Sequence, residues 1–171
     1  CIGRRSEFMS ICKAMLKTGI LPDFITVDGA EGGTGAAPAE FSNRLGVPID
    51  EALIFVHSCL KGIGHRQDIR VIASGKIVSG FDMLEKLALG ADMCNVARPM
   101  MFALGCIQSL RCHNNTCPTG IATQDAIRAR AVNVGTRQQH VANYHAATVE
   151  SLRELIGALG LDGPEDLGPQ H

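Results

Sequence analysis

Three cysteines lie within twelve residues of one another in the second half of the chain. Cys106, Cys112 and Cys117 follow the pattern C-x5-C-x4-C, and a proline follows the last of them. Iron–sulfur clusters are held by thiolates grouped in short loops, and a C-P ending occurs in ferredoxin-type sites. A structural zinc site usually needs four ligands, and His113 is badly placed as a fourth because it adjoins Cys112. The spacing therefore favours an iron–sulfur cluster, and the alternative is three buried or reactive thiols.

Two short turns that follow predicted strands have the residues to bind a phosphate group. They are Ser74-Gly75-Lys76 and Ala97-Arg98-Pro99. In β/α barrels, the loops after the last two strands commonly bind a cofactor phosphate through backbone N–H groups. Arg98 offers a bidentate contact to such a phosphate. The equally weighted alternative is a surface arginine beside a proline turn.

A glycine-rich loop, residues 28–38, follows an earlier predicted strand. It contains Gly32, Gly33, Thr34 and Gly35. Glycines let the backbone approach a flat ligand and adopt positive φ angles at little cost. The loop has neither the G-x-G-x-x-G spacing of a dinucleotide site nor the G-K-S or G-K-T ending of a phosphate loop. It is either a ligand-binding loop or a tight β/α turn.

The remaining reactive side chains give weaker signals. An N-terminal cysteine such as Cys1 can be an amidotransferase nucleophile. Here the following residues run directly into a predicted helix and a β/α unit, so we do not assign that role. His57 and His65 are isolated, and His140 and His145 are five residues apart, off the i, i+4 spacing of paired ligands.

Composition limits the class of protein. The 171 residues are 46% hydrophobic and 19% charged, with a formal net charge of −1. This balance predicts a folded domain and argues against nucleic acid or an anionic membrane as partner. Seven cysteines cannot all pair within the chain. No apolar run approaches the roughly 20 residues that span a bilayer, and no signal-peptide pattern is present, so we expect a cytoplasmic protein. Because the chain starts at Cys1 rather than Met, we expect a fragment or a processed product.

The sites lie between elements of a parallel β/α pattern. Helices are predicted over residues 6–18, 50–61, 81–89 and 136–159, and strands over residues 23–27, 70–74 and 93–96. Asp50 and Thr136 are the expected N-caps. Strand, glycine loop and helix in repeated order predict a parallel sheet with ligands at the carboxyl ends of its strands. Three strands do not complete an eight-stranded barrel.

Taken together, these features resemble the C-terminal part of the FMN-binding synthase domain of glutamate synthase. The resemblance rests on residues 28–38, 74–91 and 106–124. That family carries a loop ending in G-G-T-G-A, as residues 32–36 do here, and the C-x5-C-x4-C-P pattern. It implies an α/β fold, the C-terminal portion of a TIM-type (β/α) barrel. Residues 1–135 would belong to the barrel, with an iron–sulfur loop at 105–120, and residues 136–171 would form a C-terminal helical extension.

The resemblance also implies cofactors and their ligands. It makes Cys106, Cys112 and Cys117 the ligands of a 3Fe–4S cluster. It sets the glycine loop at 32–35 beside the flavin and substrate, and lets Ser74 hydrogen-bond a ribityl hydroxyl. The residues that it sets at the FMN phosphate are Gly75, Lys76, Ala97 and Arg98.

In that family, reduced FMN delivers a hydride to 2-iminoglutarate, which forms from 2-oxoglutarate and ammonia released from glutamine. Electrons come from a donor such as ferredoxin or a reductase subunit. We expect the isolated chain to be inactive. Two alternatives are a noncatalytic iron–sulfur module that binds a partner and an FMN-dependent 2-hydroxy-acid oxidase, whose turn Ala97-Arg98-Pro99 resembles. Those oxidases have a histidine base after the sixth strand, and residues 28–31 contain no histidine.

Overall fold

Three parallel strands form the sheet in the part of the chain that the computed structural model describes, residues 1–30, 37, 39–43 and 45–171. The strands are β1 (Phe24–Asp28), β2 (Arg70–Ser74) and β3 (Met93–Asn95), in the order β1-β2-β3. This confirms the predicted mixed α/β fold with parallel strands. The predicted strand over residues 70–74 is observed with the same bounds, and the other two differ by one residue.

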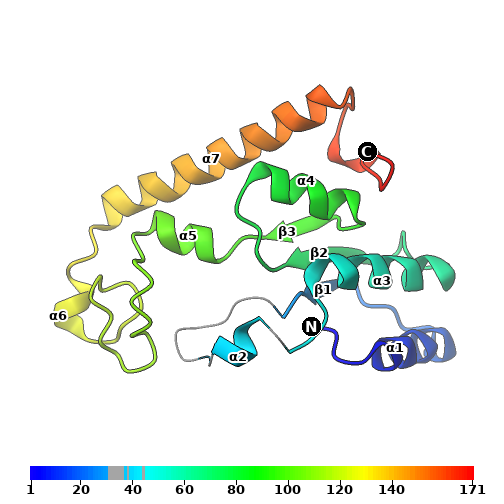
Figure 1. The fold of residues 1–171 in the computed structure, drawn as a ribbon, viewed down its shortest axis with the longest axis horizontal. Helices are drawn as coiled ribbons and strands as arrows, with labels where there is room; N and C mark the ends of the chain where they lie inside the picture. Colours follow the sequence, from blue (N-terminus) through cyan, green and yellow to red (C-terminus); the bar gives the residue numbers. More distant parts are fainter. Residues whose placement is uncertain (31–36, 38, 44) are drawn as a thin grey trace.

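Helices connect and cover these strands (Figure 1). The helices around the sheet are α1 (Arg5–Thr18), α2 (Ala39–Ser42), α3 (Ile49–Gly62), α4 (Gly80–Ala88) and α5 (Arg98–Ala103). The helices beyond it are α6 (Ala126–Ala129), α7 (Val134–Ala158) and a short 3-10 turn, η1 (Pro164–Asp166). None of the helices in the described segments is long and apolar enough to cross a membrane.

The hydrophobic core lies between α3 and one face of the sheet. Val71 and Ala73 point to this face because side chains alternate along a strand. Leu53 and Leu60 of α3 pack into the same core and are fully buried. On the outer side of α3, α1 contributes Phe8 to this cluster. The face of the sheet that these helices cover is therefore fixed by burial.

The opposite face of the sheet is largely open. Phe24 and Met93 are 56% and 46% exposed on this face. The register also aligns Asp28, Ser74 and Asn95 across the three strands. A row of polar side chains thus ends the sheet at the carboxyl end of its strands.

The two expected N-caps were wrong. Helix α3 begins at Ile49, so Asp50 lies in its first turn, where the carboxylate pairs with Lys86 Nζ at 2.5 Å. Helix α7 begins two residues before Thr136, and Asn133 is its N-cap. The Asn133 side chain accepts a hydrogen bond from the Thr136 backbone N–H at 3.1 Å. Both errors arose because capping-type side chains are also favourable in a first helical turn.

Helix α7 packs along α4 and α5 (Figure 1). A Cβ on Gly80 would lie 2.7 Å from the Leu152 backbone nitrogen, so the absence of a side chain permits the close approach of α4 and α7. The Tyr144 hydroxyl also donates a hydrogen bond to the Val78 carbonyl at 2.5 Å. The domain boundary expected near residue 135 remains a prediction.

Candidate functional site at the carboxyl end of the sheet

A cavity of about 770 Å³ opens at the carboxyl end of the three strands. Its lining includes the aligned polar row of Asp28, Ser74 and Asn95, which are the last residues of the three strands. Small-molecule and cofactor sites commonly enclose roughly 300–1,000 Å³. The cavity is therefore large enough for a cofactor, and it lies where parallel β/α folds bind their ligands.

The turn after β2 contributes one wall of this cavity. Gly75 and Lys76 both have positive φ angles, 140° and 47°, and both line the cavity. A lysine in the left-handed region is uncommon and marks a backbone that its surroundings hold in place. The Gly29 backbone N–H donates to the Ser74 carbonyl at 2.9 Å, which joins this turn to the loop after β1. The predicted residues at 74–76 are thus brought to the cavity.

The turn after β3 contributes a second wall. Ala97 is the N-cap of α5, and Ala97, Arg98 and Pro99 all line the cavity. Pro99 is buried, which anchors the turn, whereas Arg98 is exposed. The two turns predicted to act together therefore meet at one cavity. Lys76 and Arg98 give it two positively charged side chains, which suit a phosphate.

The cysteine segment, residues 105–133, forms the far side of the cavity. The structure brings two of its three thiols there. Cys106 and Cys112 line the cavity, whereas Cys117 is not part of the lining and is 5% exposed. All three thiols are free. Within the described residues, no three His, Cys, Asp or Glu side chains lie close enough together to hold a metal ion. The arrangement does not assemble the three sulfurs into a preformed metal site.

Cys117 nevertheless has an environment that favours its thiolate. The Thr119 hydroxyl lies 3.3 Å from Cys117 Sγ, and backbone N–H groups, Ala122 foremost, also point to the sulfur. These donors lower the Cys117 pKa from about 9 to about 7. Burial raises the pKa of Cys94 in the sheet to about 11. Because the thiolate is the metal-binding form, Cys117 is the better prepared ligand of the two.

Asn115 fixes the shape of the cysteine segment, and the sequence analysis missed it. Its φ of 63° lies in the left-handed region, which asparagine tolerates better than most residues. The Thr123 hydroxyl donates to the Asn115 carbonyl at 2.9 Å, and the Gln124 backbone N–H donates to Asn115 Oδ1 at 2.5 Å. The signal that could have indicated this role is an asparagine in the turn between two cysteines.

Four of the predicted site residues cannot be placed, and the cavity has lining residues that were not predicted. The glycine-loop residues Gly32, Gly33, Thr34 and Gly35 lie outside the described residues. Cavity-lining residues that the sequence analysis missed include Asn95 and Phe102. A polar residue at the end of an apolar strand was the available signal for Asn95.

Solved structures identify the class of fold. The chain is similar to a flavocytochrome b2 mutant with pyruvate bound, with a TM-score of 0.58 and 15% identity over 98% of this chain and 32% of that chain. A second flavocytochrome b2 mutant, with benzoylformate, gives a TM-score of 0.53 and 20% identity over 95% of this chain and 37% of that chain. At these identities the likeness defines the fold alone. The protein is thus an α/β protein that shares part of the flavocytochrome b2 fold, with a cavity at the carboxyl ends of its strands.

Sequence comparison then identifies the family. Residues 8–162 match the family model described as the conserved region in glutamate synthase, and the chain belongs to the glutamate synthase family. It is 43% identical to the glutamate synthase large subunit-like protein YerD of Bacillus subtilis, over 99% of this chain and 32% of that protein. It is 40% identical to an archaeal NADPH glutamate synthase of Methanocaldococcus jannaschii, over 85% of this chain and 28% of that protein.

A plant relative belongs to the same family, and this chain covers only a small part of its length. The chloroplastic/mitochondrial ferredoxin-dependent glutamate synthase 1 of Arabidopsis thaliana is 33% identical over 85% of this chain and 9% of that protein. The chain thus spans about a third or less of these relatives. The resemblance stated from the sequence is confirmed.

Proposed function

We propose that this chain supplies the C-terminal part of an FMN-binding barrel in a glutamate synthase that forms L-glutamate reductively. The single observation that carries the proposal is the cavity of about 770 Å³, which adjoins the ends of all three strands and the cysteine segment. A ligand there would contact both the turns at 74–76 and 97–99 and the thiols of Cys106 and Cys112. The family match supports this assignment over other enzymes that bind a ligand at the same end of a sheet.

The residues present fit FMN by the chemistry of their donors. Gly75, Lys76, Ala97 and Arg98 would hold the phosphate, and Ser74 would hydrogen-bond a ribityl hydroxyl. All five line the cavity. When bound, FMN would supply hydride transfer. The work of this chain would be to anchor the phosphate end, because a charge-assisted contact from Arg98 fixes position as well as affinity.

The cysteine segment fits an iron–sulfur cluster in ligand type but not in the arrangement of its sulfurs. Three thiols follow the pattern C-x5-C-x4-C with the C-P ending that occurs in ferredoxin-type sites, and Cys117 is already favoured as a thiolate. Cys106 and Cys112 stand on the cavity wall, which supports a cluster beside the flavin. We propose that metal loading draws the three sulfurs together to hold a 3Fe–4S cluster, since metal binding commonly couples to local folding.

The open face of the sheet supports a longer barrel. Phe24 and Met93 are exposed there, and a parallel sheet is normally covered on both faces. The chain spans 32% of its Bacillus relative, so the remaining strands of the full protein would cover this face. The substrates of that protein would be 2-oxoglutarate and glutamine or ammonia. Its electron donor would be ferredoxin or a reductase subunit. The plant relative is named ferredoxin-dependent, and the name of the archaeal relative gives NADPH.

The experiment that tests this function is FMN binding by the full protein. Arg98→Ala should weaken FMN affinity about ten- to a hundredfold, since a charge-assisted hydrogen bond is worth about 1.5–3 kcal/mol. Fluorescence titration of the flavin-free protein measures the affinity. Iron content should not change.

Arg153→Ala is the matched control, because Arg153 is an exposed arginine on α7 that does not line the cavity. It should leave FMN affinity unchanged. Equal FMN affinity in the wild type and the Arg98→Ala variant would contradict the phosphate assignment.

A further inference from the structure

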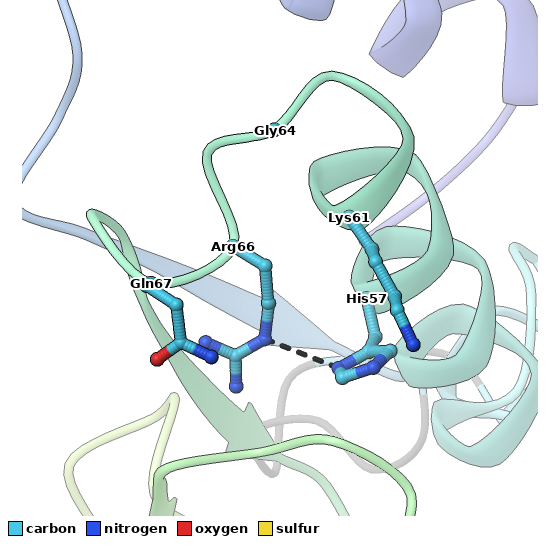
Figure 2. Close-up of a pocket in the computed structure, with 5 residues that line it drawn as sticks. All are labelled: His57, Lys61, Gly64, Arg66 and Gln67. Atoms are coloured by element: carbon cyan, nitrogen blue, oxygen red, sulfur yellow. Dashed lines mark hydrogen bonds between the residues drawn. The ribbon is translucent and has the colours of Figure 1, made fainter.

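A second, smaller cavity lies at the other end of the sheet, beside the amino ends of β2 and β3. It encloses about 260 Å³ (Figure 2). His57 and Lys61 of α3 line it together with Gly64, Arg66 and Gln67 of the segment that leads into β2. Every lining residue is polar, charged or glycine, so the cavity suits a polar occupant. The flavin proposed above occupies the other cavity, and this one has no role in that proposal.

A network of hydrogen bonds holds Arg66 and His57 in position. The Arg66 guanidinium donates to His57 Nδ1 at 3.1 Å and to the Gly90 carbonyl at 3.0 Å, and it pairs with Asp92 at 3.0 Å. It also donates to the Ile69 carbonyl at 3.2 Å. Because Nδ1 accepts from Arg66, the neutral ring carries its proton on Nε2. The Arg66 and His57 side chains are thereby held in place at the cavity.

The absence of a side chain on Gly90 leaves room for the His57 ring. The φ of Gly90 is +108°, and a Cβ added there would overlap the ring. Gly90 belongs to the 74–91 stretch that contributed to the family resemblance. In the chain it lies between the turns at 74–76 and 97–99, but it precedes the amino end of β3. Its close contact with the ring gives that segment a structural role at the amino end of the sheet.

The charges around the cavity leave an excess of positive charge. Arg66 and Arg70 share the Asp92 carboxylate, at 3.0 Å and 3.6 Å. Asp68 is hydrogen-bonded to His65 at 2.8 Å, outside the lining. Lys61 forms no ion pair with any described residue, and its ammonium adds a third cation against the two carboxylates. The cavity is therefore suited to an anion.

The electrostatics of His57 point the same way. Burial lowers the His57 pKa, and the neighbouring Arg66 and Lys61 charges lower it further. The Gly90 carbonyl and, less strongly, Asp92 have the opposite, smaller effect. Figure 2 shows the Lys61 side chain running beside the His57 ring. With His57 neutral, an anion here would offset the repulsion between the Arg66 and Lys61 cations.

We propose that this cavity binds the phosphate group of a small phosphomonoester, held by Lys61 and the His57 Nε2–H. The volume of about 260 Å³ leaves room for an organic group attached to the phosphate. Binding would tie α3 to the segment before β2 and stabilise this end of the sheet by mass action. The site is separate from the flavin cavity and does not depend on the proposed function.

The test is titration of the full protein, saturated with FMN so that its flavin cavity is filled, with inorganic phosphate and glycerol phosphate. Isothermal titration calorimetry at constant ionic strength should detect binding of both probes. Lys61→Gln should weaken binding at least tenfold, and Lys61→Arg should restore most of the loss. Lys61 is exposed, so these changes do not disturb the core.

Two control variants separate this site from other effects. Lys13→Gln removes an equally exposed lysine from α1 and should leave phosphate binding unchanged. Arg98→Ala, tested at saturating FMN, should also leave it unchanged, so failure of the flavin proposal and failure of this one are distinguishable. Absence of phosphate binding, equal affinity in Lys61→Gln and wild type, or tighter binding of acetate than of phosphate would each overturn the proposal.

Discussion

The β/α region, residues 1–104, and the cysteine segment, residues 105–133, are held together by different interactions. In the β/α region, fully buried side chains such as Leu53, Leu60 and Val71 join α3 to the sheet. In the cysteine segment, Cys117 and Gly120 are the only buried residues, and every residue of the segment is described. Its shape depends instead on hydrogen bonds of polar side chains such as Asn115 and Asp125.

This difference indicates which of the two regions depends on a ligand for its final structure. Buried apolar area stabilises the β/α region whether or not a cofactor is bound. Exposed hydrogen bonds contribute little net stability each, so the cysteine segment has little to resist rearrangement. We therefore expect the turns at 74–76 and 97–99 to be preformed. The three sulfurs of the proposed metal site should come together only when the metal binds.

The largest effect should follow from a cavity in the core of the β/α region. Leu53→Ala should lower the free energy of unfolding by about 2–5 kcal/mol, because it removes fully buried methyl groups that neighbours cannot replace. Denaturant-induced unfolding of the full protein measures the loss. Ile127→Ala in the cysteine segment is the control. Ile127 is 81% exposed, so we expect a change within about 0.5 kcal/mol. A comparable loss in both variants would remove the distinction between the two regions.

A smaller effect should follow from removing one donor to the Cys117 sulfur. Thr119→Val should raise the Cys117 pKa from about 7 by about one unit, the worth of one hydrogen bond to a charged group. Thr119→Ser should preserve the lower value. The pH profile of Cys117 alkylation in the iron-free protein, read by mass spectrometry, gives the pKa.

The sign of the pH dependence follows from the same donors. The folded state lowers the Cys117 pKa, so this group's contribution to stability is fully present above about pH 9 and is lost as the pH falls through about 7. An alkylation midpoint that stays the same in Thr119→Val would show that the hydroxyl does not stabilise the thiolate.

The β/α region could be read from the sequence because its signals are local and repeated. Runs with β-branched residues predicted β1 and β2, and the apolar spacing in α3 predicted the helix that covers them. The predicted helix over residues 6–18 ends as α1 does, at Thr18, and Gly19 follows it with a φ of 69°. The N-caps at Asp50 and Thr136 were wrong because nearby positions satisfy the same backbone donors. The local sequence thus predicts the type of each element more reliably than the residue at which the element begins.

The site could be read only in part, because its geometry depends on contacts between distant residues. The pairing of residues 74–76 with residues 97–99 followed from the rule that parallel strands end at one edge. The separation of Cys117 from the cavity could not be inferred from C-x5-C-x4-C spacing, since it depends on the positive φ of Asn115 and on donors at 119–122. The second, smaller cavity at the amino end of the sheet was also missed, because His57 and Gly90 meet only after the sheet has formed.

The measurement that tests the central claim most directly is the flavin and iron content of the full protein after anaerobic reconstitution with FMN, iron and sulfide. The account predicts that the wild type binds both. Serine at Cys106, Cys112 or Cys117 should remove most of the iron, since a cluster that loses one of three thiolates is poorly held, while FMN remains bound. Flavin without iron in the wild type would favour an oxidase, and iron without flavin would favour a partner-binding module. Either result, or full iron retention in all three variants, would contradict the assignment of a joint flavin and iron–sulfur site.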